Sequence, residues 1–318
     1  MFKNSKIYVA GHTGLLGSAF IRKLKEQRYS NIITRTHKEL DLTNQNAVDE
    51  FFKKEQPEYV FLAAGLTGGI IANKTYPAKF LHTNISMQDN VFESAAKYEV
   101  RHLIFYGSSC IYPKNSPQPM KEEYLLTGII EKTSEAYAIA KTAGIIACRA
   151  YNIQYKTNRF IALVPSSMYG HNDNFDPENS HVLSALIRKF HEAKAAGKNQ
   201  VVLWGSGNPR REFIFSEDVA DASIFTMLNA EKLENMHYNI GTGTDYSIKE
   251  LAEIISEIVG FDGAVDWDTS KPDGAPKKLL DSSKFLKFAW KPSFALKEGL
   301  EITYQWYLNN FQQTRDGI

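Results

Sequence analysis

Short apolar runs alternate with longer amphipathic stretches over the first half of the chain. The apolar runs, which predict buried strands, cover residues 6–10, 31–35, 59–65, 101–106 and 159–166. The stretches with helical spacing cover residues 18–27, 44–54, 78–98 and 134–154. Strands that alternate with crossover helices form parallel sheets. The pattern therefore predicts an α/β fold with a doubly wound parallel sheet of the Rossmann type.

The regular alternation of apolar runs and amphipathic stretches ends after Pro165. Loops rich in Asn, Asp, Pro and Gly, at 169–180, 205–210 and 271–276, separate isolated helices and short strands. Residues 211–228 again have the pattern of a strand that leads into a helix. We therefore expect two interleaved domains. The first comprises residues 1–165 and about 210–243, and the second, a smaller α/β domain, comprises about 166–209 and 244–318.

The first predicted strand ends in a glycine-rich segment, Gly11-His-Thr-Gly14-Leu-Leu-Gly17. Glycine allows a tight turn at the first position, lets a pyrophosphate approach the backbone at the second, and lets the helix pack closely at the third. Because the segment joins a strand to a helix, it predicts a dinucleotide-binding site. Other residues expected at this cofactor are Thr13, Leu15, Asp41, Leu42, Ala63 and Ala64.

The end of the second strand indicates which dinucleotide to expect. NAD-specific sites usually carry an acidic residue there, which binds the ribose diol. This chain instead reads Thr34-Arg35-Thr36-His37-Lys38. The guanidinium of Arg35 can clamp a 2′-phosphate, which favours NADP. The alternative is a solvated turn that carries ordinary surface cations.

Tyr137 and Lys141 are four residues apart in a helical segment of small residues, AYAIAKTAG, so both side chains share one face. A nearby ammonium stabilises phenolate and makes Tyr137 a proton donor to a carbonyl that receives hydride. Ser108 or Ser109, after the preceding strand, supplies a hydroxyl for the reacting oxygen. The alternative is a structural tyrosine beside an exposed lysine.

Charge and cysteine content exclude several classes of protein. The chain carries 37 basic and 36 acidic residues, so no global field attracts nucleic acid or anionic lipid. No apolar stretch reaches the roughly 18 residues of a membrane span, and no secretory signal is recognisable. We expect a cytoplasmic protein. Cys110 and Cys148 cannot build a disulfide framework or a CxxC metal site, so no metal is expected.

Further motifs are spread over nearly the whole chain. They are VAGHTGLLGSA, NKTYPA, GSSCIYPK, AYAIAKTAGI, NSHV, WGSG, RREF, NIGTG and SKPDGAPKKLLD. In these segments the chain resembles the extended short-chain dehydrogenases/reductases, and more narrowly the GDP-L-fucose synthase family. The resemblance implies NADPH, a homodimer, and one active site that epimerises GDP-4-keto-6-deoxy-mannose at C3 and C5 and then reduces C4.

The resemblance also implies roles for individual residues. Ser108, Tyr137 and Lys141 would form the reductase triad, and Cys110 and His181 would be the base and the acid of epimerisation. Lys141, Pro165, Ser167 and His181 complete the expected cofactor contacts. The expected substrate contacts are Ser108, Ser109, Lys189, Trp204, Arg211, Asp273 and Lys278. The chain departs from the family pattern at Lys189, where arginine is usual, at Gly65-Leu66-Thr67 and at Ser166-Ser167.

Other functions stay open at this point. One is a reductase for another GDP-4-keto sugar, such as a 6-deoxy-heptose or a dideoxy-hexose, with or without epimerisation. Another is a redox-neutral nucleotide-sugar epimerase or dehydratase, and a third is a dinucleotide-sensing protein without turnover. Cys110 can be core packing, a redox group, a nucleophile or a proton carrier. His181 can be a helix-capping or solvent-facing residue.

Overall fold

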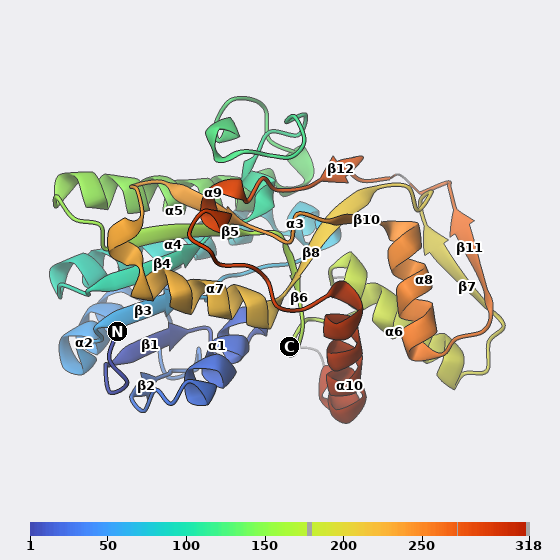
Figure 1. Cartoon of the computed structure of the whole chain (residues 1–318), viewed down its shortest axis with the longest axis horizontal. Coiled ribbons are helices and arrows are strands. Elements are labelled where there is room, and N and C mark those ends of the chain that lie inside the picture. The colour runs from blue at the N-terminus through green and yellow to red at the C-terminus, as the bar shows by residue number, and fades with distance from the viewer. Residues whose placement is uncertain (177–179, 272, 316–318) are drawn as a thin grey trace.

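The computed structural model describes residues 1–176, 180–271 and 273–315, which form a larger and a smaller lobe (Figure 1). Within these residues, a six-stranded parallel sheet has the order β2-β1-β3-β4-β5-β9. Its strands are β1 (Ile7–Ala10), β2 (Ile32–Ile33), β3 (Tyr59–Leu62), β4 (His102–Tyr106), β5 (Phe160–Pro165) and β9 (His237–Ile240). The predicted doubly wound sheet is confirmed.

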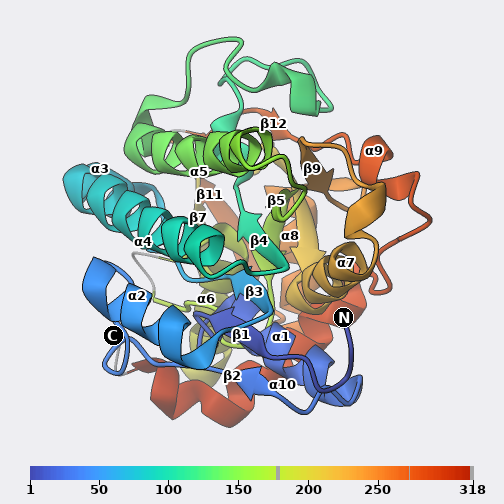
Figure 2. The same cartoon turned by 90° about the vertical axis from the view of Figure 1, so that its left-hand side faces the viewer.

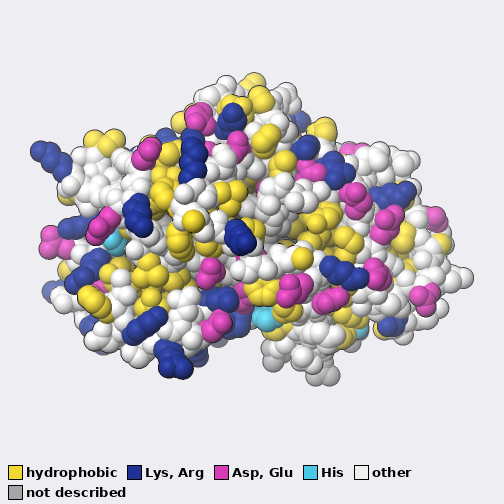
Figure 3. Space-filling model, viewed as in Figure 1, with side chains coloured by type: hydrophobic (Ala, Val, Ile, Leu, Met, Phe, Trp, Pro, Cys, Tyr) yellow, Lys and Arg dark blue, Asp and Glu magenta, His cyan; other side chains and the backbone are white. Residues whose placement is uncertain are grey.

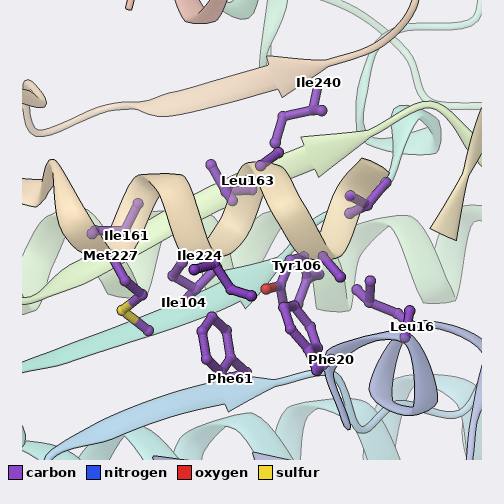
Figure 4. Close-up of a cluster of buried hydrophobic side chains, with 14 of the residues drawn as sticks. Leu16, Phe20, Phe61, Ile104, Tyr106, Ile161, Leu163, Ile224, Met227 and Ile240 are labelled. Atoms are coloured by element: carbon purple, nitrogen blue, oxygen red, sulfur yellow. The ribbon is translucent and has the colours of Figure 1, made fainter. Parts of the chain in front are cut away.

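Helices cover both faces of this sheet (Figure 2). On one face lie α1 (Leu15–Glu26) and α7 (Ser216–Leu228), and on the other lie α2 (Gln45–Glu55), α4 (Pro77–Lys97) and α5 (Glu135–Gln154). Figure 4 shows the core beneath α1 and α7, where Phe20 stacks on Phe61 with ring centroids 4.3 Å apart. Because both faces are covered, the strands are almost wholly apolar, as the sequence pattern predicted.

The smaller lobe has its own core and, among the described residues, two small sheets. One sheet contains β6 (Ser167–Tyr169), β8 (Arg210–Phe215), β10 (Asp245–Ser247) and β12 (Lys277–Lys278), and the other pairs β7 (Gln200–Trp204) with β11 (Ala264–Asp268). The helices are α6 (Val182–Ala195), α8 (Ile248–Val259) and α10 (Leu296–Arg315). A capping box of Ser247 and Glu250 begins α8.

The chain passes between the two lobes several times. α7 and β9 pack in the larger lobe, whereas β8 pairs with strands of the smaller lobe. Phe285, from α9 (Ser283–Leu286), and Trp290 pack into the core of the larger lobe. A short apolar strand fits either sheet, so its pattern does not reveal its partner.

Short elements complete the larger lobe. They are α3 (Ile70–Thr75) and four 3-10 turns, η1 (Ser109–Ile111), η2 (Glu122–Tyr124), η3 (Lys132–Ser134) and η4 (Ala230–Lys232). Basic and acidic side chains are mixed with one another over the face seen in Figure 3.

Among the helices of the described residues, none is long and apolar enough to cross a lipid bilayer.

Candidate active site

The candidate site lies at the carboxyl edge of the large sheet. Ala10 and Leu62, the last residues of β1 and β3, are in register with Phe105, the residue before the last of β4. The glycine-rich segment, the Ala63–Gly65 segment and the Ser108 segment therefore emerge side by side. The strand order reverses between β1 and β3, and such a switch point is where open α/β sheets bind ligands.

The glycine-rich segment has the shape that a pyrophosphate requires. A Cβ atom on Gly11 would lie 2.8 Å from the backbone N and Cα of Ala64, and one on Gly17 would lie 2.0 Å from the carbonyl oxygen of Gly11. Gly14 is the N-cap of α1 and no side chain caps the helix there. The backbone N–H groups of the first helical turn are thus available to an anion, as in dinucleotide-binding folds.

Arg35 lies just after β2 and is held in place by its neighbours. Its guanidinium donates to Glu55 Oε1 at 2.6 Å and to the carbonyl oxygen of Thr34 at 2.7 Å, and lies 5.4 Å from the ring centroid of Phe51. The turn that follows is closed by Asp41, whose carboxylate accepts hydrogen bonds from Thr43. Arg35 is therefore a fixed cation at the end of the second strand.

The serine, tyrosine and lysine predicted from the sequence meet at the ends of β3 and β4. The Ser108 hydroxyl lies next to both the phenol of Tyr137 and the thiol of Cys110, and its proximity lowers the pKa of each. The ammonium of Lys141 lies 5.8 Å from the ring centroid of Tyr137 and 4.9 Å from that of Phe105. Of the two serines that the sequence offered, Ser108 is the one with these contacts.

Burial controls the protonation of these groups. It raises the pKa of Tyr137 further than the Ser108 hydrogen bond lowers it, so the phenol keeps its proton and can donate it. The Lys141 ammonium, expected from the sequence to stabilise phenolate, does not offset this desolvation, so the pKa of Tyr137 rises. Burial also lowers the pKa of Lys141 to about 8. In Cys110, burial raises the thiol pKa, while Ser108 and the ammonium groups of Lys278 and Lys141 lower it.

Lys278 reaches this cluster from the smaller lobe. It lies on β12 opposite Arg211 of β8, and it lines a pocket together with Ser109, Cys110 and Tyr112. Burial lowers the lysine pKa, while the charge of Cys110 raises it. Lys278 therefore lies beside the thiol, a placement that the sequence did not predict.

The other expected substrate contacts line the smaller lobe. The indole of Trp204 is 60% exposed and lies near two ammonium groups, 5.3 Å from Lys189 Nζ and 5.6 Å from Lys271 Nζ. Arg211 is anchored on the carbonyl oxygen of Ala275 at 2.7 Å. Asp273 accepts two hydrogen bonds from Ser206, at 2.9 and 2.7 Å. Lys271, within the SKPDGAPKKLLD motif, was missed by the sequence reasoning.

His181 lies at the start of α6. It is the exposed N-cap of α6, and its electrostatic partner is Asp173, whose carboxylate accepts a hydrogen bond from Ser184. Burial raises the pKa of Asp173, and the attraction of His181 lowers it. Hydrogen bonds of the described residues do not link His181 to Cys110. Its place opposite the thiol stays a prediction, and Asp173 is a neighbour that the sequence did not reveal.

Comparison with known proteins agrees with this geometry. Residues 7–241 match the NAD dependent epimerase/dehydratase family. The chain is 54% identical to the putative GDP-L-fucose synthase 2 of Arabidopsis thaliana, over 98% of this chain and 94% of that protein. It is 46% identical to the GDP-L-fucose synthase of Escherichia coli (strain K12), over 98% of each.

Solved structures have the same fold. The GDP-mannoheptose C4 reductase from Campylobacter jejuni with NADP bound is 44% identical, with a TM-score of 0.89 over 97% of this chain and 99% of that one. A GDP-L-fucose synthetase from Naegleria fowleri bound to NADP is 28% identical, with a TM-score of 0.89 over 99% and 97%. The chain thus belongs to the NAD-dependent epimerase/dehydratase family, within the group that contains the GDP-L-fucose synthases.

Proposed function

We propose that this chain is an NADPH-dependent GDP-4-keto-6-deoxy-mannose 3,5-epimerase-4-reductase that produces GDP-L-fucose. The observation that carries the proposal is the Ser108 hydroxyl, which lies next to a proton-donating phenol and an ionisable thiol at once. A ketone oxygen placed at this hydroxyl has a proton donor, Tyr137, beside it and a base, Cys110, within reach of the adjacent carbon. The high identity to GDP-L-fucose synthases supports the choice of sugar.

The residues fit an NADP cofactor, whose reduced form, NADPH, supplies the hydride when it is bound. The glycine-rich segment would hold the pyrophosphate, and Arg35, fixed by Glu55, would bind the 2′-phosphate. The similar GDP-mannoheptose C4 reductase was solved with NADP bound, which supports this choice. Asp41, Leu42, Ala63, Ala64, Pro165 and Ser167 are proposed to line the rest of the cofactor site.

Epimerisation requires the chain to remove a carbon-bound proton and return one to the opposite face. The C4 ketone acidifies the hydrogens on C3 and C5, and the Cys110 thiolate would take one of them. The electron pair moves onto the ketone oxygen, where Ser108 and Tyr137 stabilise the enolate through hydrogen bonds. His181 would then protonate the carbon from the other face.

Reduction uses the same hydrogen bonds from Ser108 and Tyr137 to the ketone oxygen. As hydride reaches C4, the negative charge that develops on oxygen is neutralised by the proton of Tyr137. The Lys141 ammonium then stabilises the resulting phenolate until solvent returns the proton. Trp204, with Lys189 and Lys271 at its sides, is proposed to stack on the guanine, and Arg211 to bind the diphosphate.

The proposed homodimer would form on the outer faces of α4 and α5. Ile139, Ile146 and Ile153 recur every seven residues on α5 and are exposed, as is Ile85 on α4. A second copy of these helices would cover this apolar strip. Ile146→Asp should convert the dimer to monomer in light scattering, and an unchanged dimer would exclude this surface.

Both cysteines are free thiols, which suits the proposed cytoplasmic location.

Isotope exchange tests the proposed epimerisation. Incubated in D2O with GDP-4-keto-6-deoxy-mannose and no NADPH, the enzyme should introduce deuterium at C3 and C5. Cys110→Ala should abolish the exchange, whereas Cys148→Ala, which alters a buried cysteine on α5, should retain it. Tyr137→Phe should abolish NADPH oxidation. A wild-type enzyme without exchange, or a Tyr137→Phe variant with full NADPH oxidation, would rule out the assignment.

A second candidate is a C4 reductase for a related GDP-4-keto heptose or dideoxy-hexose. It is favoured by the 44% identity to the Campylobacter jejuni GDP-mannoheptose C4 reductase and by Lys189, which replaces the usual arginine. Product analysis by NMR with a panel of GDP-4-keto sugars separates the two functions. Turnover of heptose substrates in preference to the 6-deoxy-hexose would select the second candidate.

A further inference from the structure

A chain of buried hydrogen bonds lies behind Cys110. Arg149 Nη2 lies 2.6 Å from His237 Nδ1, His237 Nε2 lies 3.0 Å from Tyr112 Oη, and Tyr112 Oη lies 2.5 Å from Asn239 Oδ1. Tyr112, His237 and Asn239 are all at least nine-tenths buried. Tyr112, an inner member of this network, directly follows the η1 turn that carries Cys110, so the backbone connects the network to that turn.

The donors and acceptors of the network are determined by chemistry. A guanidinium has no acceptor, so Arg149 donates to His237 Nδ1, and the neutral ring then carries its proton on Nε2. That N–H donates to Tyr112, whose own hydroxyl proton is left to donate to Asn239. Burial, together with the charge of Arg149, lowers the pKa of His237 to about 3, so the ring is neutral at working pH.

Asn239 connects the network to the other walls of the Cys110 pocket. Its side-chain amide donates to the carbonyl oxygens of Met120 and Asp281, at 3.0 and 3.1 Å, and its backbone N–H donates to Glu122 Oε1 at 3.1 Å. Met120 forms an isolated parallel bridge with Leu280, next to the β12 segment. Residues 110–122, β9 and the segment after β12 are thus joined around one pocket, which Cys110, Met120 and Lys278 line.

The polar character of this network calls for an explanation beyond stability. Each buried polar group costs about 1–3 kcal/mol if a partner is lost, whereas apolar side chains would fill the same space without that risk. Hydrogen bonds, unlike apolar contacts, fix direction as well as distance. A polar network is therefore suited to setting the position of a turn.

We infer that Tyr112, His237 and Asn239 are positioning residues, which hold the 109–111 turn so that the Cys110 thiol faces the reacting carbon. The inference rests on the proposed function for the role of the thiol in proton transfer. It adds residues on β9 and on the segment after η1 to those that the reaction requires. The network should therefore affect proton abstraction more than hydride transfer, which depends on Tyr137 and Lys141 of α5.

Tyr112→Phe tests the inference, with Tyr238→Phe as the matched control. Tyr238 is the residue between His237 and Asn239 on β9, so its side chain points to the opposite face of the sheet. It is 2% exposed, and its hydroxyl has one hydrogen bond, from the backbone N–H of Glu234 at 2.8 Å. Each variant therefore loses one buried hydroxyl, but only Tyr112→Phe breaks the network.

Two measurements distinguish positioning from a general loss of stability. The first is the rate at which iodoacetamide alkylates Cys110 in the free enzyme, with Cys148, which is 2% exposed, protected by burial. The second is the ratio of deuterium exchange at C3 and C5 to ketone reduction. Unfolding lowers both reactions together and leaves that ratio unchanged.

In Tyr112→Phe, we expect the alkylation rate to change several-fold and the exchange-to-reduction ratio to fall about tenfold, since small displacements cost large factors in rate. In Tyr238→Phe both should match wild type. Equal behaviour of the two variants would overturn the inference. Arg149→Met, which removes only the outermost donor, should give a weaker change of the same sign, and it replaces Tyr112→Phe as the test if that variant does not fold. If wild type shows no exchange, the proposed function fails, and the alkylation rates still decide the positioning inference.

Discussion

Gly144 lies where α5 packs closely against Phe105 of β4. A Cβ atom there would lie 2.3 Å from Cζ and 2.6 Å from Cε1 of Phe105, whereas carbon atoms in contact are about 3.5–4.0 Å apart. The Phe105 ring is 1% exposed and packs edge-on against Phe92, with centroids 5.6 Å apart. Because Lys141 lies over the same ring, Gly144→Ala must displace either the helix or the ring that supports the ammonium.

The expected magnitudes follow from this clash. Extra volume in a packed core costs about 1–3 kcal/mol, and alanine recovers about 0.5–1 kcal/mol over glycine in a helix. The free energy of unfolding should therefore fall by at most about 2.5 kcal/mol, and the protein should still fold. Displacement of a reacting group by about 1 Å costs up to roughly 100-fold in rate. We expect kcat for ketone reduction to fall about 10- to 100-fold.

The assay compares Gly144→Ala with Gly299→Ala on α10 of the smaller lobe. A Cβ atom on Gly299 would lie 2.2 Å from Tyr169 Oη and 2.9 Å from its Cζ, so the control has the same change and a similar clash. Denaturant unfolding gives the stability of both variants, and NADPH oxidation gives kcat. If both variants lose similar stability and Gly144→Ala keeps wild-type kcat, the close packing of α5 does not set the catalytic geometry.

Three further predictions concern charge. Burial lowers the pKa of Lys141 to about 8, and the ammonium is the active form. The value of kcat/KM for reduction should therefore fall as pH rises through about 8, and Lys141→Arg should remove that fall. A flat wild-type profile up to pH about 10 would contradict this role. Lys278→Gln should raise the pKa of Cys110, which is measured from the pH dependence of alkylation. Lys277→Gln is the control and should leave that pKa unchanged, because the Lys277 ammonium pairs with Asp245 at 2.6 Å. Equal profiles for the two variants would exclude Lys278 as a partner of the thiol. Arg35→Ala should raise KM for NADPH about 10- to 100-fold, because charged hydrogen bonds to the 2′-phosphate contribute about 1.5–3 kcal/mol. The variant should leave KM for NADH, which lacks that phosphate, almost unchanged. A parallel rise for both cofactors would contradict 2′-phosphate recognition.

The large sheet could be predicted from sequence because its strands are buried on both faces and therefore read as apolar runs. Boundaries were less certain where polar residues continue a strand pattern. Residues 31–35 predict a five-residue strand, but only Ile32 and Ile33 pair, since Thr34 and Arg35 leave the edge of the sheet. The helix α3 was missed because its six residues are too few to show helical periodicity.

The candidate site was predictable where its residues are close in sequence or follow strands. Tyr137 and Lys141 share a helix face, and Ser108 follows β4, so local rules bring them to one edge. Lys278 reaches Cys110 only because β12 pairs with β8, a contact between distant segments that carries no local signal. His237 and Asn239 lie on β9, where their polar side chains gave no indication of a network behind the thiol.

The most direct test of the account is the isotope pattern of the product. A single turnover of GDP-4-keto-6-deoxy-mannose with NADPH in D2O, followed by NMR, reports both chemistries in one molecule. If the same bound ketone is used for epimerisation and for reduction, the product should be GDP-L-fucose with deuterium at C3 and C5 and protium at C4. A reduced product that retains protium at C3 and C5 would show that the chain reduces the ketone without epimerising the sugar, and would contradict the account.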